Sequence, residues 1–565
     1  MSHRFSHAPR STRAWVRELE HSLRRALPVL CLLAGAAAPA RALQSDLIGE
    51  WPVPPSPAGN PPDGRVRLLG QLLFWEEQLS SDNTMACGTC HDFAQGGADP
   101  RATAQHPSTL SQGSFGMRAQ DVLRDYVDDA QFGTGRQLTP MTAPSVLTSG
   151  FFERLFWDRS GDDSFEDEAG NALIGFEQHA GLEAQAVLPV TSAVEMGHGG
   201  IQWADVTAKL AGTTPWRLAT APPPAVQLYL GYTYEVLFDW AFGTQTPNVT
   251  RERVAQALAA YQRTLVPNNA PIDAPAQLSP SEANGLALFT QRPTKNQFAR
   301  SCSACHSASL FGGLELDGPL FAEPNDNVFS DGLRHAIGLN DVQSANDGVP
   351  FRTPSLRNVG LRKRFMHDGR MSTLDEVLDF YNGDPTHGDA KFGFAQPLSV
   401  SELADLKAFL LALTDPNVAS NQPPFDRPTL YSETHPFESN LYGDTSPPQP
   451  SNAPRILASD PPLVDDVTGN PYFRVGIAGV GANTPAMLLL SPGQDTGTWH
   501  LGIHFWIDHT NFTPEPVQTV SGVGTYHLSA PLSDAGLIGV PFYAQWMVFD
   551  PAGRTATEAA SFLRL

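Results

Sequence analysis

Apolar residues recur at helical spacing through the first three quarters of the chain. This spacing predicts helices over residues 66–74, 225–242 and 250–266, the last with Thr250 as its N-cap. Two further helices are expected to begin at capping boxes, in which a serine precedes a glutamate by three residues: Ser279 with Glu282, and Ser399 with Glu402. This part of the protein is therefore predicted to be mainly α-helical.

Beyond residue 453, the spacing of apolar residues changes from one typical of helices to one typical of strands. Alternating, β-branched or aromatic runs lie at 472–480, 486–490, 498–507, 525–528 and 540–549, with Gly, Pro and Asp between them. We expect residues 454–565 to form a small all-β sandwich domain. The Pro-, Ser- and Asn-rich residues 416–453 before it are predicted to be a linker.

The first 42 residues are predicted to be an export signal. Five arginines from Arg10 to Arg25 precede an apolar run over 26–38, and Ala40-Arg41-Ala42 offers a small-residue cleavage site. A membrane anchor is the alternative, although the run is too short to span a bilayer comfortably. We therefore expect a periplasmic or secreted protein with no membrane span in the mature chain.

Four of the five cysteines fall in two copies of one short motif. Cys87-Gly88-Thr89-Cys90-His91 and Cys302-Ser303-Ala304-Cys305-His306 both have the attachment pattern of a c-type haem. The two thiols add across the porphyrin vinyl groups, and the histidine is then held against the iron. The fifth cysteine, Cys31, lies in the predicted signal, so we expect no disulfide and two covalently bound c-type haems.

A helix before each motif and another after it is the order of elements in a cytochrome c domain. We therefore expect a mainly α fold with two cytochrome c-like haem domains, at residues 43–268 and 269–415, followed by the linker and the β-sandwich domain. The length of 565 residues agrees with three or four domains of roughly 150 residues each.

Charge and acid–base groups narrow the functions that two haems could serve. A formal net charge of −22 argues against nucleic-acid binding, which needs a basic face, and favours attraction of a basic electron-donor protein. Two haems are also compatible with a protein that only carries electrons. Catalysis would require acid–base groups beside an iron that has a free coordination position. Residues 182–197 supply candidates, since Gln185 and Glu195 lie on either side of Pro189. A solvated loop is the alternative interpretation of this segment.

The chain resembles the bacterial dihaem cytochrome c peroxidases and their relative MauG over roughly residues 65–415. The resemblance rests on both haem motifs, on the group of Gln185, Pro189 and Glu195, and on the segments 73–80, 156–158, 351–358 and 365–370. It implies that the first haem takes peroxide, with His91 as its proximal ligand.

On the distal side of the first haem, the resemblance gives Glu195 the role of moving a proton from the near to the far peroxide oxygen. Gln185 would orient the bound oxygen, and Pro189 would shape the pocket. Trp157 corresponds to the tryptophan that relays electrons between the haems. A core aromatic residue is the alternative for Trp157, because an acidic insertion after it departs from the family's pattern.

For the second haem, the resemblance implies His306 as the proximal ligand and Tyr381 as the other axial ligand. Tyr381 lies fourteen residues after His367, where the simplest peroxidases have Met and MauG-like members have Tyr. Because a phenolate stabilises ferric and higher iron states, we expect this haem to have a low potential. Packing in the core is the alternative role for Tyr381.

The resemblance also implies two less direct metal contacts. His106, fifteen residues after His91, lies near the position of a histidine that caps the first iron at rest in some members, and a surface histidine is the alternative. A calcium ion between the haems is usual in the family, bound around Arg352 and Pro354. Thr142 stands where an asparagine is expected to contribute to that site.

Three other histidines are given lesser roles. His198 follows Glu195 closely and is expected to lie on a loop surface, with modulation of the pocket as the alternative. His500 and His504 are expected to share one strand face of the β-domain, without a metal.

The leading hypothesis is an exported dihaem c-type peroxidase that reduces hydrogen peroxide with electrons from a small donor protein, a cytochrome c or a cupredoxin. A MauG-like oxidase of a protein or organic substrate is the runner-up, favoured by Tyr381 and disfavoured by His106 as a ligand. A non-catalytic dihaem electron carrier is the alternative from another class. A homodimer is compatible with all three.

Overall fold

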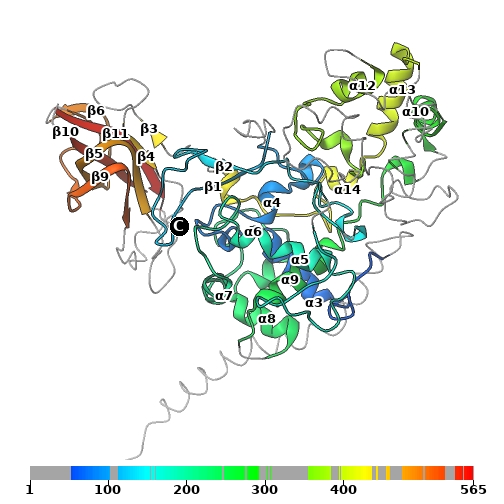
Figure 1. Ribbon diagram of the computed structural model, residues 1–565, viewed down its shortest axis with the longest axis horizontal. Coiled ribbons are helices and arrows are strands. Elements are labelled where there is room, and N and C mark those ends of the chain that lie inside the picture. The colour runs from blue at the N-terminus through cyan, green and yellow to red at the C-terminus, as the bar shows by residue number, and fades with distance from the viewer. Residues whose placement is uncertain are drawn as a thin grey trace, which may run out of the picture.

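The computed structural model describes residues 53–101, 112–152, 154–158, 161–244, 247–273, 277–291, 302, 306, 354–383, 394, 396–434, 441–442, 454–457, 474–500, 503–527, 541–550 and 553–563. Helices form two units with separate apolar cores, and strands form a third region (Figure 1). The predicted signal, residues 1–42, lies outside the described residues. In the part of the chain that is described, no helix has both the length and the apolar character needed to cross a membrane.

The first helical unit carries the first cysteine motif. Its helices are α3 (Gly64–Phe74), η1 (Glu77–Leu79), α4 (Cys87–Cys90), η2 (Phe93–Gln95), η3 (Ser149–Phe151), α5 (Gly181–Ala186), α6 (Leu188–Thr191), α7 (Trp203–Ala211), η4 (Gln227–Tyr229), α8 (Tyr234–Phe242) and α9 (Arg251–Gln262), and a short ribbon pairs β1 (Phe115–Arg118) with β2 (Arg136–Leu138). The helix predicted over 225–242 begins only at Tyr234, because Thr233 before it is extended.

Helices α3 and α9 form the centre of this unit. α3 is capped by Asp63, whose carboxylate accepts the N–H groups of Arg65 and Val66. The two helices cross at Gly70, where a Cβ would lie 1.8 Å from the carbonyl oxygen of Ala257. Only glycine permits this approach, which lets the apolar residues of both helices pack in one core.

The second helical unit repeats this crossing. It contains η5 (Pro271–Asp273), α10 (Pro280–Gln291), η10 (Val359–Leu361), α12 (Leu374–Asn382) and α13 (Val400–Leu411), and the capping boxes predicted for α10 and α13 are both formed. At Gly285 in α10, a Cβ would lie 2.0 Å from Asp405 O in α13.

Aromatic rings follow the glycine at equivalent places in the two units. Phe74, four residues after Gly70, contacts Tyr261 of α9 with 5.5 Å between ring centroids. Phe289, four residues after Gly285, contacts Phe409 of α13 at 5.1 Å. The two cysteine motifs thus follow helices that are packed in the same way.

Residues 415–434 return from the second unit to the first. α14 (Pro416–Ala419) follows the cap residue Asp415, and α15 (Tyr431–Thr434) begins where the Glu77 carboxylate accepts two backbone N–H groups. Val418, Phe425 and Leu430 are buried in the core of the first unit. The prediction of a linker is therefore wrong for residues 416–434, because the apolar residues spaced among the prolines pack against the first unit.

The C-terminal strands form a curled antiparallel sheet and a covering hairpin. The strands are β3 (Leu441–Tyr442), β4 (Arg455–Leu457), β5 (Arg474–Ser491), β6 (Gln494–His500), β7 (Ile503–Ile507), β8 (Thr513–Pro514), β9 (Gln518–His527), β10 (Pro541–Asp550) and β11 (Gly553–Leu563). The sheet order is β3-β11-β10-β5-β4, with β8 and β9 also paired to β5. The hairpin of β6 and β7 packs on one face, where Ile503 and Phe505 share a core with Leu489.

Within the described residues of 454–565, every helix or strand is a strand, as expected, whereas the sandwich form stays a prediction. Residues 474–480 and 486–490, from two runs predicted as separate strands, belong to the single long strand β5. In Figure 1 the sheet stands on the side of the first helical unit that carries β1 and β2, away from α10, α12 and α13.

Candidate active site

The first cysteine motif is held in place by Trp75. The motif forms α4, and Thr89 Oγ1 accepts the N–H group of Ala86 at 2.8 Å to begin the turn. A Cβ at Gly88 would lie 2.1 Å from the buried indole ring of Trp75. The motif can therefore pack this closely against the ring only with glycine at position 88.

His91 is oriented by backbone carbonyls. Its Nδ1 lies 3.0 Å from the carbonyl oxygen of Pro144 and 3.4 Å from that of Gly97, so we assign the proton to Nδ1. Burial lowers the pKa of His91, with the two carbonyl contacts opposing the shift. A neutral imidazole whose Nδ1 donates in this way leaves Nε2 as a metal ligand.

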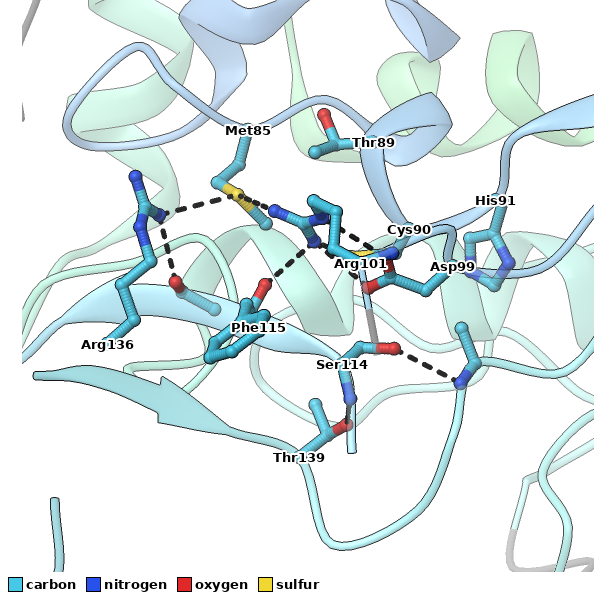
Figure 2. A network of polar contacts seen from close by, with 12 residues as sticks. Met85, Thr89, Cys90, His91, Asp99, Arg101, Ser114, Phe115, Arg136 and Thr139 are labelled. Atoms are coloured by element: carbon cyan, nitrogen blue, oxygen red, sulfur yellow. Dashed lines mark hydrogen bonds and ion pairs between the residues drawn. The ribbon is translucent and has the colours of Figure 1, made fainter. Parts of the chain in front are cut away.

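An arginine network joins this motif to β1. Arg101 donates from Nη2 to Cys90 Sγ at 3.3 Å, to Asp99 at 3.0 Å and to Phe115 O at 2.9 Å (Figure 2). Arg136 donates to the next carbonyl of β1, that of Gly116, at 2.9 Å. The position of β1 is therefore fixed relative to the cysteines.

Glu195 lies on a loop that docks on the same strand. The N–H group of Met117 in β1 donates to Glu195 O at 3.1 Å. A Cβ at Gly116 would lie 1.6 Å from Val194 O, so the loop reaches the strand only because residue 116 is glycine. The loop itself is closed by the N–H groups of Glu195 and Gly197, which both donate to Ser192 O.

The charge of Glu195 acts on the cysteine motif. Burial raises the pKa of the Cys87 thiol to about 12, and the nearby Glu195 carboxylate adds to the rise. The same two causes raise the pKa of Cys90, where Asp99 contributes as well. Burial also raises the pKa of Glu195 itself, against a hydrogen bond from Ser192. The structure therefore brings together a partly desolvated carboxyl group and the first motif.

Gln185 and Pro189 lie on the two short helices that precede this loop. Gln185 is in α5 and Pro189 in α6, and Met196 N donates to Pro189 O at 3.2 Å. α5 is held by an ion pair in which the two terminal guanidinium nitrogens of Arg263, Nη1 and Nη2, contact the carboxylate of Glu183 at 2.8 Å. The predicted group of Gln185, Pro189 and Glu195 is thus one continuous structural segment.

Trp157 lies where the two helical units meet. Its Nε1 donates to Thr142 O at 2.8 Å, and its ring meets the ring of His367 edge-on with 6.4 Å between centroids. Thr142 also donates from N and from Oγ1 to His367 O, at 3.0 and 3.1 Å. The side chain of Trp157 is 7% exposed. Its position between the units suits the predicted relay.

The second motif is described at two of its positions, Cys302 and His306. The His306 N–H group donates to Cys302 O at 2.9 Å, and His306 Nδ1 lies 3.2 Å from Pro354 O. Burial lowers the pKa of His306 to about 4, with the Pro354 contact opposing the shift. Nε2 is thereby left as the ligand atom, as in His91.

Tyr381 is near the C-terminal end of α12. Its side chain and that of Cys302 pack at the edge of the same apolar core, and its ring meets Phe380 at 5.2 Å. The iron-ligand role of Tyr381 stays a prediction. Cys305, His106 and Arg352, which carry three of the other predictions, lie outside the described residues.

A proline–serine repeat that anchors both histidines was missed in the sequence. Pro144-Ser145 and Pro354-Ser355 supply the two carbonyls, and in each the serine Oγ accepts the N–H group two residues on, at 3.2 Å. Each segment then has a residue with positive φ, Thr148 at 70° and Asn358 at 60°. The sequence signal for this anchor is the Pro-Ser pair that recurs in residues 142–149 and 352–359.

The calcium prediction gains no support. The oxygen of Thr142 accepts from Trp157 and the oxygen of Pro354 accepts from His306. Across the described residues, no group of three or more His, Cys, Asp or Glu is arranged to hold a metal ion.

Two predictions about histidines are wrong. His198 is 6% exposed rather than on the surface, and its Nδ1 lies 2.8 Å from Ser81 Oγ. His500 pairs with Ile503 and His504 pairs with Trp499. Successive pairs of an antiparallel ladder point to opposite faces, so the two histidines lie on opposite faces of the hairpin.

The described residues of both motifs fit covalent haem. Each histidine is half-buried, has its Nδ1 against a proline carbonyl and keeps Nε2 for iron. The thiols of Cys87 and Cys90 lie at the edge of the apolar core of the first unit, as Cys302 does in the second. An apolar wall beside the thiols suits the porphyrin face, and an oriented imidazole suits ligation of its iron.

Comparison with known proteins identifies relatives for the helical part of the chain. Residues 65–278 match the family model described as di-haem cytochrome c peroxidase. The methylamine utilization protein MauG of Methylophilus methylotrophus is 27% identical over 376 residues, which cover 64% of this chain and 85% of MauG. The cytochrome-c peroxidase IdrP1 of Denitromonas iodatirespirans is 28% identical over 428 residues, covering 70% of this chain and 94% of IdrP1.

Among solved structures, a MauG-like protein associated with microbial copper homeostasis matches with a TM-score of 0.43 and 23% identity. The match covers 66% of this chain and 96% of that protein.

Proposed function

This chain is a relative of the dihaem cytochrome c peroxidases and of MauG, and from that premise we propose that it is an exported dihaem peroxidase. It reduces hydrogen peroxide at the first motif, with electrons that a small donor protein delivers. Residues 43–268 and 269–415 each hold one haem, and the C-terminal sheet is an additional domain.

The observation that carries this proposal is the place of Glu195. Its carboxylate is close enough to Cys87 and Cys90 to raise the pKa of both thiols, and its loop is tied to β1, which Arg101 ties to the motif. When bound, a haem at His91 supplies an iron that takes up peroxide and passes electrons to it. The acid–base work falls to Glu195.

Glu195 acts by holding and moving one proton. Hydrogen peroxide must gain two electrons and two protons to become two waters, and the proton on the near oxygen has to reach the far one before the O–O bond breaks. Because burial raises the pKa of Glu195, this carboxyl group accepts and returns a proton more readily near neutral pH than an exposed glutamate does. Gln185 and Pro189, on the helices that lead into the loop, orient the bound oxygen and limit the space around it.

The second unit serves electron delivery. Trp157 is buried between the units, against Thr142 of the first and His367 of the second, and provides the aromatic contact through which electrons cross. Tyr381 and His306 would be the two protein side chains that hold the iron of the second haem. The acidic chain, with a net charge of −22, attracts a basic donor such as a small cytochrome c or a cupredoxin in the periplasm.

The experiment that tests this proposal measures the reaction of peroxide with the first haem. Stopped-flow absorbance in the Soret band is recorded for the wild-type holoprotein, for Glu195→Gln and for Glu168→Gln, which neutralises an exposed carboxylate elsewhere. We expect Glu195→Gln to slow the reaction by about 100-fold or more, the contribution of one positioned acid–base group, and Glu168→Gln to leave it unchanged. Equal rates in all three proteins would remove Glu195 from the mechanism.

A MauG-like oxidase is the second candidate, and Tyr381 favours it. In this case the oxidising equivalents drawn from peroxide oxidise a protein residue or an organic molecule at the surface. Mixing the holoprotein with peroxide, with and without a reduced small cytochrome c, separates the candidates. Rapid oxidation of the cytochrome supports the peroxidase, whereas an oxidised state that persists and ignores the cytochrome supports the oxidase. A non-catalytic carrier would react with peroxide in neither arm.

A further inference from the structure

We propose that the C-terminal sheet is a working part of the active site, because it holds the backbone on which Glu195 is carried. The connection is the loop of residues 119–127, which continues directly from β1 and lies between the sheet and the Glu195 loop. This inference rests on the proposed role of Glu195. Tyr126 and Arg474 are the positioning residues.

The sheet and the 119–127 loop are packed at Tyr126. Its ring is 4% exposed and shares a small core with Leu457 of β4 and Ala478 of β5. A Cβ at Gly476 in β5 would lie 2.5 Å from Tyr126 Cδ2, so the ring lies directly on that glycine. The Tyr126 N–H group donates to Thr525 Oγ1 of β9 at 2.9 Å.

A buried arginine of the sheet reaches the same loop. Arg474, the first residue of β5, is fully buried and donates from Nη1 to Arg124 O, and to Gln120 Oε1 at 3.4 Å. At the rim, His527 Nε2 lies 2.6 Å from Asp125 Oδ1. Four residues of the loop therefore contact the sheet by packing, hydrogen bonding or charge.

Internal hydrogen bonds fix the shape of the 119–127 loop, so a displacement at the sheet is passed on to the Glu195 loop. Asp121 Oδ1 accepts the N–H groups of Leu123 and Asp125, at 2.8 and 3.0 Å, which closes the turn. The Val127 N–H group donates to Ala119 O at 3.1 Å at the base. Because both ends and the turn are tied, a shift of Tyr126 moves the whole loop.

The far side of the loop meets the segment that carries Glu195. The Gly199 N–H group donates to Gln120 O at 2.8 Å. Arg124 Nη1 donates to Ser81 O at 3.3 Å, and the Ser81 N–H group donates to Met196 O at 2.9 Å. Met117 N also donates to Glu195 O. Residues 195–199 are therefore hydrogen-bonded to three separate positions of the chain: Ser81, Met117 in β1 and Gln120 in the 119–127 loop.

Electrostatics follow the same route. Burial lowers the pKa of His198 to about 4, and the positive charges of Arg124 and Arg474 add to the shift. His198 is therefore neutral at pH 7 and keeps its contact with Ser81 as an uncharged residue. Lys209 acts in the same direction, so the sheet supplies one of the three positive charges that favour the neutral form of His198.

The test disturbs the contact between the sheet and the 119–127 loop by adding a single methyl group. Gly476→Ala places a Cβ against Tyr126, and Gly481→Ala is the matched control in the same strand, where the nearest atom is Thr484 Oγ1 at 3.2 Å. Two quantities are measured on each holoprotein: amide hydrogen exchange of peptides that contain Ser81, Met117 and Gly199, and the rate of the first haem with peroxide. Haem content and the spectrum of the second haem are recorded for every variant.

We expect Gly476→Ala to speed the exchange of these peptides and to slow the peroxide reaction by at least tenfold, with haem content unchanged. Gly481→Ala should match the wild type in both. Unchanged exchange would overturn the bracing, and faster exchange with an unchanged rate would overturn the positioning of Glu195. If Glu195→Gln itself leaves the rate unchanged, the proposed function fails while the exchange result still decides the bracing.

A second pair of variants covers the case in which Gly476→Ala does not fold. Thr525→Val removes the acceptor of the Tyr126 N–H group at nearly constant volume, and Thr525→Ser restores it. We expect Thr525→Val to show faster exchange and a slower reaction, and Thr525→Ser to recover both. Equal behaviour of the two variants would contradict the proposal.

Discussion

The ion pair between Arg263 and Glu183 offers a sharp test of how the Gln185 helix is held. The two side chains are 8% and 0% exposed, and both contacts between guanidinium and carboxylate measure 2.8 Å. Glu183→Gln removes the negative charge and leaves the guanidinium buried. Breaking a buried pair in this way costs about 3–5 kcal/mol, which corresponds to a fall of about 10 °C in the melting temperature of a unit of this size.

The assay is differential scanning calorimetry of the holoprotein, with Glu168→Gln as the exposed control. The double variant Glu183→Leu with Arg263→Met removes both charges and should recover most of the loss. It will not recover all of it, because the carbonyls of His179 and Pro55 lose the donor Arg263, and Asn60 Nδ2 loses one of its two acceptors. A Glu183→Gln protein that melts within about 2 °C of the wild type would refute the reasoning, since that is less than 1 kcal/mol.

Three further outcomes follow from the site. Gly88→Ala places a Cβ 2.1 Å from Trp75, so we expect it to reduce the haem attached at the first motif, measured as haem per chain, while the second haem is retained. Tyr381→Met should raise the reduction potential of the second haem in a redox titration, and an unchanged potential would exclude Tyr381 as a ligand. Because burial raises the pKa of Glu195, the peroxide rate should begin to fall with decreasing pH above the ordinary carboxylate value of 4.5, and Glu195→Gln should lack this fall.

Local patterns were sufficient to predict much of the helical framework. Thr250, Ser279 and Ser399 cap helices as expected, because a cap depends only on residues within one turn. The haem motifs and the Glu195 segment could be found for the same reason, since each is short and has a fixed order of residue types. The need for glycine at positions 70 and 285, in contrast, could not be predicted locally, because it comes from carbonyl groups on helices that are distant in the sequence.

The parts that were missed depend on contacts between distant segments. Val418, Phe425 and Leu430 fill the core of the first unit although their surroundings are rich in proline. His198 is buried because Ser81, far away in the chain, meets it. Neither could follow from period or composition, because the burial of these residues is decided by the tertiary arrangement.

The packing of the C-terminal strands against the rest of the protein could not be predicted from the sequence. The strands were predicted from alternation, and nothing in that pattern distinguished a docked domain from an appended one. Tyr126 and Gly476 supply the difference, because the ring of one fits only on the bare backbone of the other.

The central claim is that the first haem reduces peroxide with the help of Glu195, and peroxide-dependent oxidation of a reduced small cytochrome c tests it most directly. Steady-state turnover is measured for the wild-type holoprotein and for Glu195→Gln at equal haem content. We predict turnover by the wild type and a loss of about 100-fold or more in Glu195→Gln. Equal turnover by the two proteins, or none by the wild type, would contradict the account.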